Sequence, residues 1–260
     1  MNRGLTCFIL LTAIVFLSGC AQFPTAGRLD VDTLRNAIVT DNVSYVRAAV
    51  ESGAISVNQR IPAPVYMEGT PLLTIAARAA SLDVMRYLIS AGADINAKTP
   101  AIETPLMLAA YFPDDYREQG GQSNYRHERA VRMLVEAGAD TENDPNNYTA
   151  LAYAAYQGHD RILRYLIEHG AHPNADAFNG MIYVNTPLMM AAIQGHSSTA
   201  LDLLNAGADA RIRVHGGHTA AEFAEKYQNT QMMPMLRCAE FLGEQETFRK
   251  KCGAGNIAAR

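Results

Sequence analysis

The sequence predicts an all-α fold, a solenoid in which short helix-turn-helix units stack in one direction. Three observations support this fold class. Each of the short apolar runs along the chain is too short to form a stable isolated helix in water, so the units must pack on one another. A Thr-Pro-Leu motif recurs at Thr70, Thr104 and Thr186. A Gly-Ala pair closes successive units, at Gly53, Gly92, Gly138, Gly170 and Gly207.

The clearest unit is residues 186–210, which reads TPLMMAAIQGHSSTALDLLNAGADA. The Thr186 hydroxyl can cap the N–H groups at the start of a first helix, and proline suits the first helical position. Gly195 breaks this helix, and a second apolar run forms another. Gly207 ends the second helix, where a left-handed residue is favoured.

Two degenerate copies, Thr149-Ala150-Leu151 and Thr219-Ala220-Ala221, extend the series, and successive starts lie 34, 45, 37 and 33 residues apart. The combined pattern, T-P-L…A-A…G-H…L-L…G-A-D with a period of about 33 residues, resembles the ankyrin repeat family. The resemblance covers residues 29–242. It implies an ankyrin-repeat solenoid with β-hairpin-like loops between units and about six repeats including the caps.

The chain departs from the family pattern where a histidine usually follows the Thr-Pro-Leu motif. Leu73, Met107, Ala152 and Met189 occupy these positions. The change removes a polar tie between neighbouring repeats, so we expect the stack to depend more on apolar packing. Terminal repeats require a polar outer face, which we expect to include Arg35, Asn36 and Asp41 in the first cap. In the last cap, the residues expected to face water are Lys226, Gln228, Asn229 and Gln231.

Residues 1–19 are predicted to be a signal peptide outside the fold. Arg3 precedes an apolar run, Leu5–Leu17, that is short for a membrane span. The run leads into Leu-Ser-Gly-Cys ending at Cys20, which resembles the bacterial lipobox, whose cysteine is acylated and becomes the first mature residue. The alternatives are an ordinary signal peptide with an incidental cysteine, and an uncleaved anchor.

The lipobox resemblance implies a lipid anchor on Cys20, such as palmitate, and a periplasm-facing location in the cell envelope. Several acyl chains hold a protein on a membrane more firmly than one chain does. Ala21, rather than aspartate, follows the cysteine, which in the enterobacterial pattern points to the outer membrane. Residues 20–28 would form an acylated tether that keeps the array near the lipid surface.

Charge and motifs argue against several classes of function. The chain carries 22 Lys and Arg against 26 Asp and Glu, a formal net charge of −4, and no basic run is interleaved with aromatic residues. No nucleic-acid partner is therefore expected. The sequence has no His-Glu-x-x-His, Gly-x-Ser-x-Gly or phosphate-cradling glycine motif, so neither an enzyme nor a cofactor is expected.

The cysteines and histidines point to structural roles. Once Cys20 is lipidated, Cys238 and Cys252 remain, and an oxidising periplasm favours a disulfide between them that pins the tail, residues 243–260. Two reduced thiols or a redox-active pair are the alternatives. His159 and His196 occupy Gly-His turns. A metal site at His215 and His218 would need a carboxylate partner and is not expected.

In the ankyrin family, hairpin tips and the exposed ends of the first helices line a concave partner-binding face. The polar insertion at residues 112–125 is either a tolerated surface excursion or a binding loop. Tyrosines are frequent at the matching positions, and interfaces favour aromatic anchors. The predicted partner-binding residues are Arg78, Glu103, Tyr111, Tyr116, Tyr148, Tyr156, Gln157, Tyr183, Asn185, Ile193, Gln194 and His218.

The sequence therefore predicts a membrane-anchored periplasmic module that binds a protein partner. One expected role is that of an immunity or inhibitor protein against an envelope-targeting effector. The other is an accessory scaffold for an envelope or oxidant-defence enzyme. The alternative from a different class is a structural envelope lipoprotein without a dedicated partner.

Overall fold

The computed structural model describes residues 30–63, 69–111, 125–142, 148–174, 186–213, 217–242 and 252. The predicted signal peptide, Cys20, the tether, the insertion up to residue 124 and the tail other than Cys252 lie outside these residues. The described helices form six pairs, α1 (Val31–Val39) with α2 (Val43–Glu51), α3 (Leu72–Arg78) with α4 (Leu82–Ser90), α5 (Pro105–Tyr111) with α6 (Arg126–Glu136), α7 (Ala150–Gln157) with α8 (Asp160–Glu168), α9 (Pro187–Gln194) with α10 (Ser197–Asn205), and α11 (Ala220–Lys226) with α12 (Met233–Leu242).

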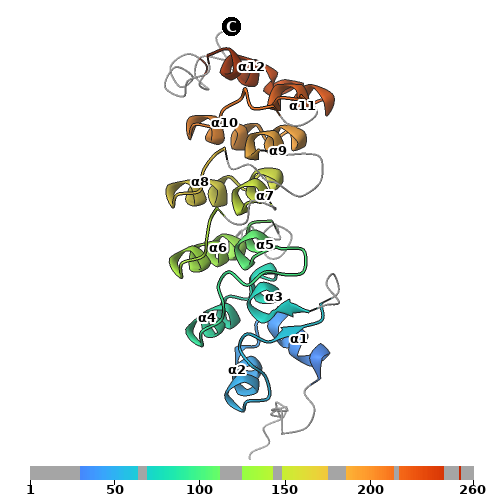
Figure 1. The fold of residues 1–260 in the computed structure, drawn as a ribbon, viewed down its shortest axis with the longest axis vertical. Coiled ribbons are helices and arrows are strands. Elements are labelled where there is room, and N and C mark those ends of the chain that lie inside the picture. Colours follow the sequence, from blue (N-terminus) through green and yellow to red (C-terminus); the bar gives the residue numbers. More distant parts are fainter. Residues whose placement is uncertain are drawn as a thin grey trace, which may run out of the picture.

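The pairs stack along one axis, with α1 and α2 at one end and α11 and α12 at the other (Figure 1). The first helices of the pairs form one layer, and the second helices form another. One short hairpin, β1 (Arg60–Ile61) antiparallel to β2 (Thr70–Pro71), leads from the first pair into the second. A single-turn 3₁₀ helix, Thr230–Met232, precedes α12. This architecture confirms the predicted all-α solenoid.

The first helices approach one another closely because small residues face the stack. Ala76 and Ala77 of α3 have no exposed surface, and neither do the alanine pairs at the same places in α5, α7 and α9. Four capping threonines fix where these helices begin. The hydroxyls of Thr104, Thr149, Thr186 and Thr219 each accept a hydrogen bond from the N–H three residues later, at 3.1–3.4 Å.

The repeats are joined by hydrogen bonds from the residue that precedes a second helix to a carbonyl at the end of the previous first helix. Ser81 Oγ donates to the Val39 carbonyl at 3.3 Å. His159 Nδ1 donates to the Ala110 carbonyl at 2.9 Å, and His196 Nε2 donates to the Tyr156 carbonyl at 3.0 Å.

Bonds from two further residues complete this series, which we term the capping ladder. The Asn229 amide donates to Ala192 and Ile193, both at 2.9 Å. His127 of α6 donates from Nε2 to the backbone carbonyl of Arg78 at 3.1 Å. The expectation that Asn229 faces water is thus wrong, because its amide fills the place that histidine takes in other repeats. Polar ties between repeats are retained, at a different position from the family's histidine.

A second set of hydrogen bonds links the loops at the far end of the second helices. Asn58 accepts from the Asp94 N–H at 2.8 Å and donates to the Gly92 carbonyl at 3.3 Å. Asn174 repeats this arrangement on the last loops, with Asp209 N–H at 2.7 Å and the Gly207 carbonyl at 3.1 Å. Each asparagine satisfies backbone groups that a helix end leaves unpaired.

Asp41 does not face water as expected, because the next repeat offers it better partners. Its Oδ1 accepts from the N–H groups of Asp83 and Val84, both at 3.0 Å, and so caps α4. Its other oxygen lies 2.8 Å from Arg126 Nη2 of α6. Unpaired N–H groups at a helix start attract a carboxylate, which explains why this polar residue turns inward.

A buried carboxylate ties α6 to α8. Glu128 is 4% exposed and lies 2.9 Å from Arg132 and 2.6 Å from Arg161. The two guanidinium groups also lie over the rings of Tyr165 and Tyr125, at 4.2 and 4.1 Å from their centroids. Burial acts to raise the pKa of Glu128, but the hydrogen bonds and positive charges of the two arginines together outweigh it and hold the pKa below its usual value.

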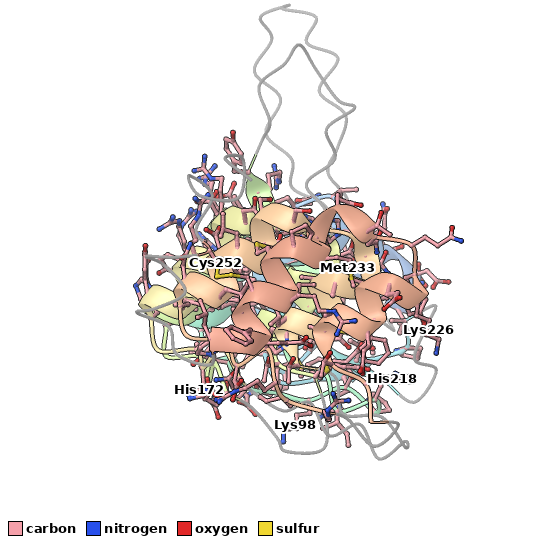
Figure 2. All side chains as sticks on the ribbon, turned by 90° about the horizontal axis from the view of Figure 1, so that it is seen from above. Lys98, His172, His218, Lys226, Met233 and Cys252 are labelled. Carbon is pink, nitrogen blue, oxygen red and sulfur yellow. A yellow bond between two sulfur atoms is a disulfide. The ribbon has the colours of Figure 1, made fainter. Side chains whose placement is uncertain are left out.

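The last pair is linked to residue 252 by a disulfide. Cys238 of α12 is bonded to Cys252, with the two Cα atoms 6.1 Å apart, a separation usual for disulfides. Cys252 is fully buried at the end of the stack (Figure 2). The link is the pairing that the sequence predicts.

We predict that Gly158→Ala destabilises the protein more than Gly170→Ala. Both glycines have positive φ, 73° and 96°, so alanine is strained at either position. A Cβ at residue 158 would also lie 2.6 Å from the ring of His196, whereas none of the neighbouring atoms is within 4 Å at residue 170. The expected difference in unfolding free energy, measured with urea, is about 1 kcal/mol or more. Equal losses would show that the close approach of His196 does not matter.

We predict that Glu128→Gln lowers the free energy of unfolding near neutral pH by about 1–2 kcal/mol, because it removes the charge that pairs with two arginines. A carboxyl whose pKa is lower in the folded state stabilises fully above its unfolded pKa and loses this effect as pH falls through the folded pKa. The difference in unfolding free energy between wild type and Glu128→Gln should therefore become smaller below about pH 4. Glu136→Gln, an exposed change on the same helix, is the control. A difference in unfolding free energy that stays constant with pH would contradict the prediction.

Candidate functional site

Four tyrosines from neighbouring repeats lie together on the layer of first helices. Tyr111, at the end of α5, packs edge-on against Tyr153 of α7 with ring centroids 5.2 Å apart. It also stacks with Tyr156, at 6.4 Å and an interplanar angle of 17°. Tyr148, just before α7, packs edge-on against Tyr153 at 5.8 Å. All four side chains are partly exposed.

Glu103 connects the cluster to the adjacent loop. The Tyr153 hydroxyl donates to Glu103 Oε1 at 3.3 Å. The loop is closed by Thr99, whose N–H donates to the Glu103 carbonyl at 2.9 Å and whose hydroxyl accepts from the Glu103 N–H at 3.2 Å. Glu103, Tyr111, Tyr148, Tyr153 and Tyr156 thus form one surface, which we term the tyrosine face.

Ile102 lies beside this face and has an unusual backbone. Its φ is +64°, a conformation that β-branched residues rarely adopt, and its side chain is 37% exposed. An apolar side chain held outward at a backbone cost suggests a contact with something outside the chain.

The other predicted partner-binding residues come from several elements, and Gln157 directly follows Tyr156 of the tyrosine face. Ile193 and Gln194 end α9, and Gln157 ends α7. His218 lies 3.7 Å from Glu222 and packs on Phe223, with ring centroids 5.5 Å apart. Arg78 lines a cavity between the first helices of the initial repeats. Tyr116, Tyr183 and Asn185 fall outside the described residues.

Sequence reasoning missed Tyr153 and Ile102. Tyr153 stands four residues after the capping Thr149, one helical turn into α7, and shares a face with Tyr156 by its three-residue spacing. That spacing was a usable signal. The sequence carries no signal for the positive φ of Ile102, because β-branched residues rarely adopt that conformation.

The described residues offer groups for surface contact. Within these segments, His, Cys, Asp and Glu side chains form no group of three that could hold a metal ion. None of the described helices combines the length and the apolar run needed to cross a membrane. The tyrosine face presents aromatic rings with hydroxyl groups and one carboxylate, which are groups that favour contact with another protein.

Comparison with known protein families agrees with this architecture. A family model described as "Ankyrin repeats (3 copies)" matches residues 99–177, and one described as "Ankyrin repeats (many copies)" matches residues 151–204. A single ankyrin repeat matches residues 68–100. The tyrosine face lies within the first of these matches. No curated protein shows significant similarity to the chain.

Proposed function

The chain belongs to the ankyrin repeat family, and we propose that it is a lipid-anchored module that binds a protein partner at the periplasmic side of a bacterial membrane. Ankyrin repeats form scaffolds for protein–protein interaction and are generally not catalytic.

The tyrosine face is the observation that carries the proposal. Tyrosine is among the residues that contribute most to binding energy at protein interfaces. Four such rings are held by mutual packing, by the bond from Tyr153 to Glu103 and by the bond from His196 to the Tyr156 carbonyl. Because these groups are ordered before a partner arrives, little side-chain entropy is lost on binding.

The anchor is supported by the lipobox-like run that ends at Cys20. An acylated Cys20 with a tether of nine residues, 20–28, would hold the array close to the lipid surface, and Ala21 favours the outer membrane. A disulfide between Cys238 and Cys252 fits an oxidising compartment such as the periplasm. The partner is then an envelope protein. An effector that attacks the envelope would make this chain an immunity protein, and an envelope or oxidant-defence enzyme would make it an accessory scaffold.

We predict that crosslinking followed by pull-down from the envelope captures one dominant protein, and that a Tyr111→Ala, Tyr156→Ala double variant loses it. Truncating two interface tyrosines commonly costs binding about 2 kcal/mol or more, about 30-fold in affinity. Tyr87→Ala is the matched control, because Tyr87 is also partly exposed but lies on α4, in the other layer. If the double variant still captures the same protein, the tyrosine face is not the binding surface. Recovery of abundant envelope proteins alone would favour a structural lipoprotein.

We predict that Cys20→Ser moves the protein from the membrane fraction to the soluble fraction or leaves an uncleaved precursor. Acylation requires the cysteine thiol, and a chain without it keeps no stable lipid anchor. Fractionation and mass measurement of the amino terminus report the outcome. An unmodified cysteine in wild-type protein, or unchanged membrane association of the variant with normal cleavage, would contradict the lipoprotein assignment.

A further inference from the structure

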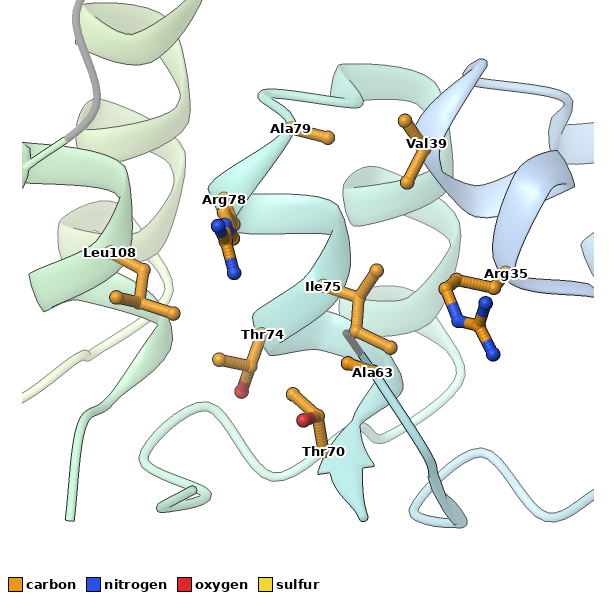
Figure 3. A pocket seen from close by; sticks show the side chains of 9 residues that line it. All are labelled: Arg35, Val39, Ala63, Thr70, Thr74, Ile75, Arg78, Ala79 and Leu108. Atoms are coloured by element: carbon orange, nitrogen blue, oxygen red, sulfur yellow. The ribbon is translucent and has the colours of Figure 1, made fainter. Parts of the chain in front are cut away.

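A cavity of about 250 Å³ opens between the first helices of the initial three repeats. Its walls are mostly apolar, with Val39 from α1, Ile75 and Ala79 from the second repeat and Leu108 from α5. Figure 3 shows that Ile75 separates two cationic side chains, Arg35 on the α1 side and Arg78 on the α5 side, while the hydroxyls of two threonines lie at one end. The two threonines are Thr70 and Thr74.

Both threonines are exceptions within the repeat series. The equivalents of Thr70 each cap a first helix through the hydroxyl, but α3 begins after Pro71 and has no side-chain cap. Thr74 stands four residues after the capping position, where the later repeats carry apolar or aromatic side chains. Those residues are Leu108, Tyr153, Met190 and Phe223. The two departures from the repeat pattern meet in one cavity.

The two hydroxyls are buried without partners. Thr70 is 3% exposed and Thr74 is not exposed at all. Within the described part of the chain, neither hydroxyl has a hydrogen-bond partner. A buried hydroxyl without a partner destabilises a protein, and sequences seldom keep two side by side without a use. Their presence in the cavity wall indicates a bound group that supplies the missing hydrogen bonds.

Charge indicates which group this is. Arg35 is held in place by Asp32, at 2.7 Å, and by the Pro62 carbonyl, at 3.0 Å, so its guanidinium is positioned at the cavity. Arg78 brings a second positive charge. The two hydroxyl donors and Arg78 together match a carboxylate, which accepts hydrogen bonds and is attracted by the cation, whereas the charge of Arg35 is already offset by Asp32.

We propose that this cavity binds the carboxyl terminus of a partner chain that ends in an aliphatic residue. The terminal side chain would contact Val39, Ile75 and Leu108, and the carboxylate would reach the threonine hydroxyls and Arg78. A volume of about 250 Å³ is below that of pockets for drug-sized ligands and suits a single terminal residue. A leucine inside a partner chain would fill the apolar part of the cavity but has no carboxylate. A glutamate inside a partner chain has a carboxylate but no apolar group for Val39, Ile75 and Leu108.

This inference rests on the proposed function, since it names the partner's chemistry on the same layer of first helices. The test uses the purified full chain and N-acetyl-alanyl-leucine with a free carboxylate, followed by methyl NMR of Ile75 and Thr74. The matching leucinamide probes the carboxylate, and hexanoate tests whether a free aliphatic acid is the true ligand. We expect the acid to bind, and the amide to bind at least about tenfold more weakly.

Two variants locate the site. Thr74→Val removes one hydroxyl with little change of shape, and Arg78→Gln removes one charge. Each should weaken binding of the acid about tenfold. Thr74→Val should not lower the urea midpoint, because the lost hydroxyl has no partner in the unliganded protein. Arg86→Gln, an exposed change on α4, should leave binding unchanged.

Three outcomes would overturn the inference. These are equal binding of acid and amide, no binding of either, or binding of hexanoate without the peptide. The proposed function fails separately, because it is judged by a captured protein that depends on Tyr111 and Tyr156. A partner that is lost in the tyrosine variant but kept in Thr74→Val and Arg78→Gln would leave the proposed function intact and refute the carboxylate site.

Discussion

The hydrogen bond that crosses from one repeat to the next is the interaction on which the structure depends. The helices have 7–11 residues, lengths at which an isolated helix is marginal in water. Apolar packing between layers holds them together but leaves them able to slide. The capping ladder fixes their register, because a donor such as His196 meets one carbonyl, that of Tyr156, at a defined point. The glycine at residue 158 leaves room for this contact.

The same constraint explains where binding surfaces arise. The capping ladder and the alanine pairs fix the residue type at most positions of each first helix. The residue type differs between repeats at the position four residues after the capping threonine and in the last turn. Tyrosines at these places build the tyrosine face in the middle of the stack. A threonine, together with Arg78, builds the cavity near its beginning. Departures from a repeat pattern are therefore the positions where this chain is distinguished from a generic solenoid.

The repeat period made the fold predictable, and the capping threonines and Gly-Ala ends set the helix limits to within about two residues. Tyr111, Tyr148, Tyr156 and Glu103 could be named because the family's geometry places them on one side. Asp41 and Asn229 were misjudged, since composition shows that a residue is polar but not that a neighbouring helix end needs it. Contacts between repeats depend on which backbone groups are left unpaired, and those appear only when the chain is folded.

Ties between repeats hold the tyrosine face rigid, and the amide hydrogen exchange of a His196→Ala variant would reveal whether they do. The control is His169→Ala, because His169 bonds to Tyr165 within its own helix, at 2.8 Å. We expect His196→Ala to speed exchange in the last turns of both α7 and α9 by about five- to tenfold, the effect of losing one hydrogen bond. His169→Ala should leave these turns unchanged. Equal protection of α7 in wild type and His196→Ala would show that the bond between repeats does not hold the tyrosine face.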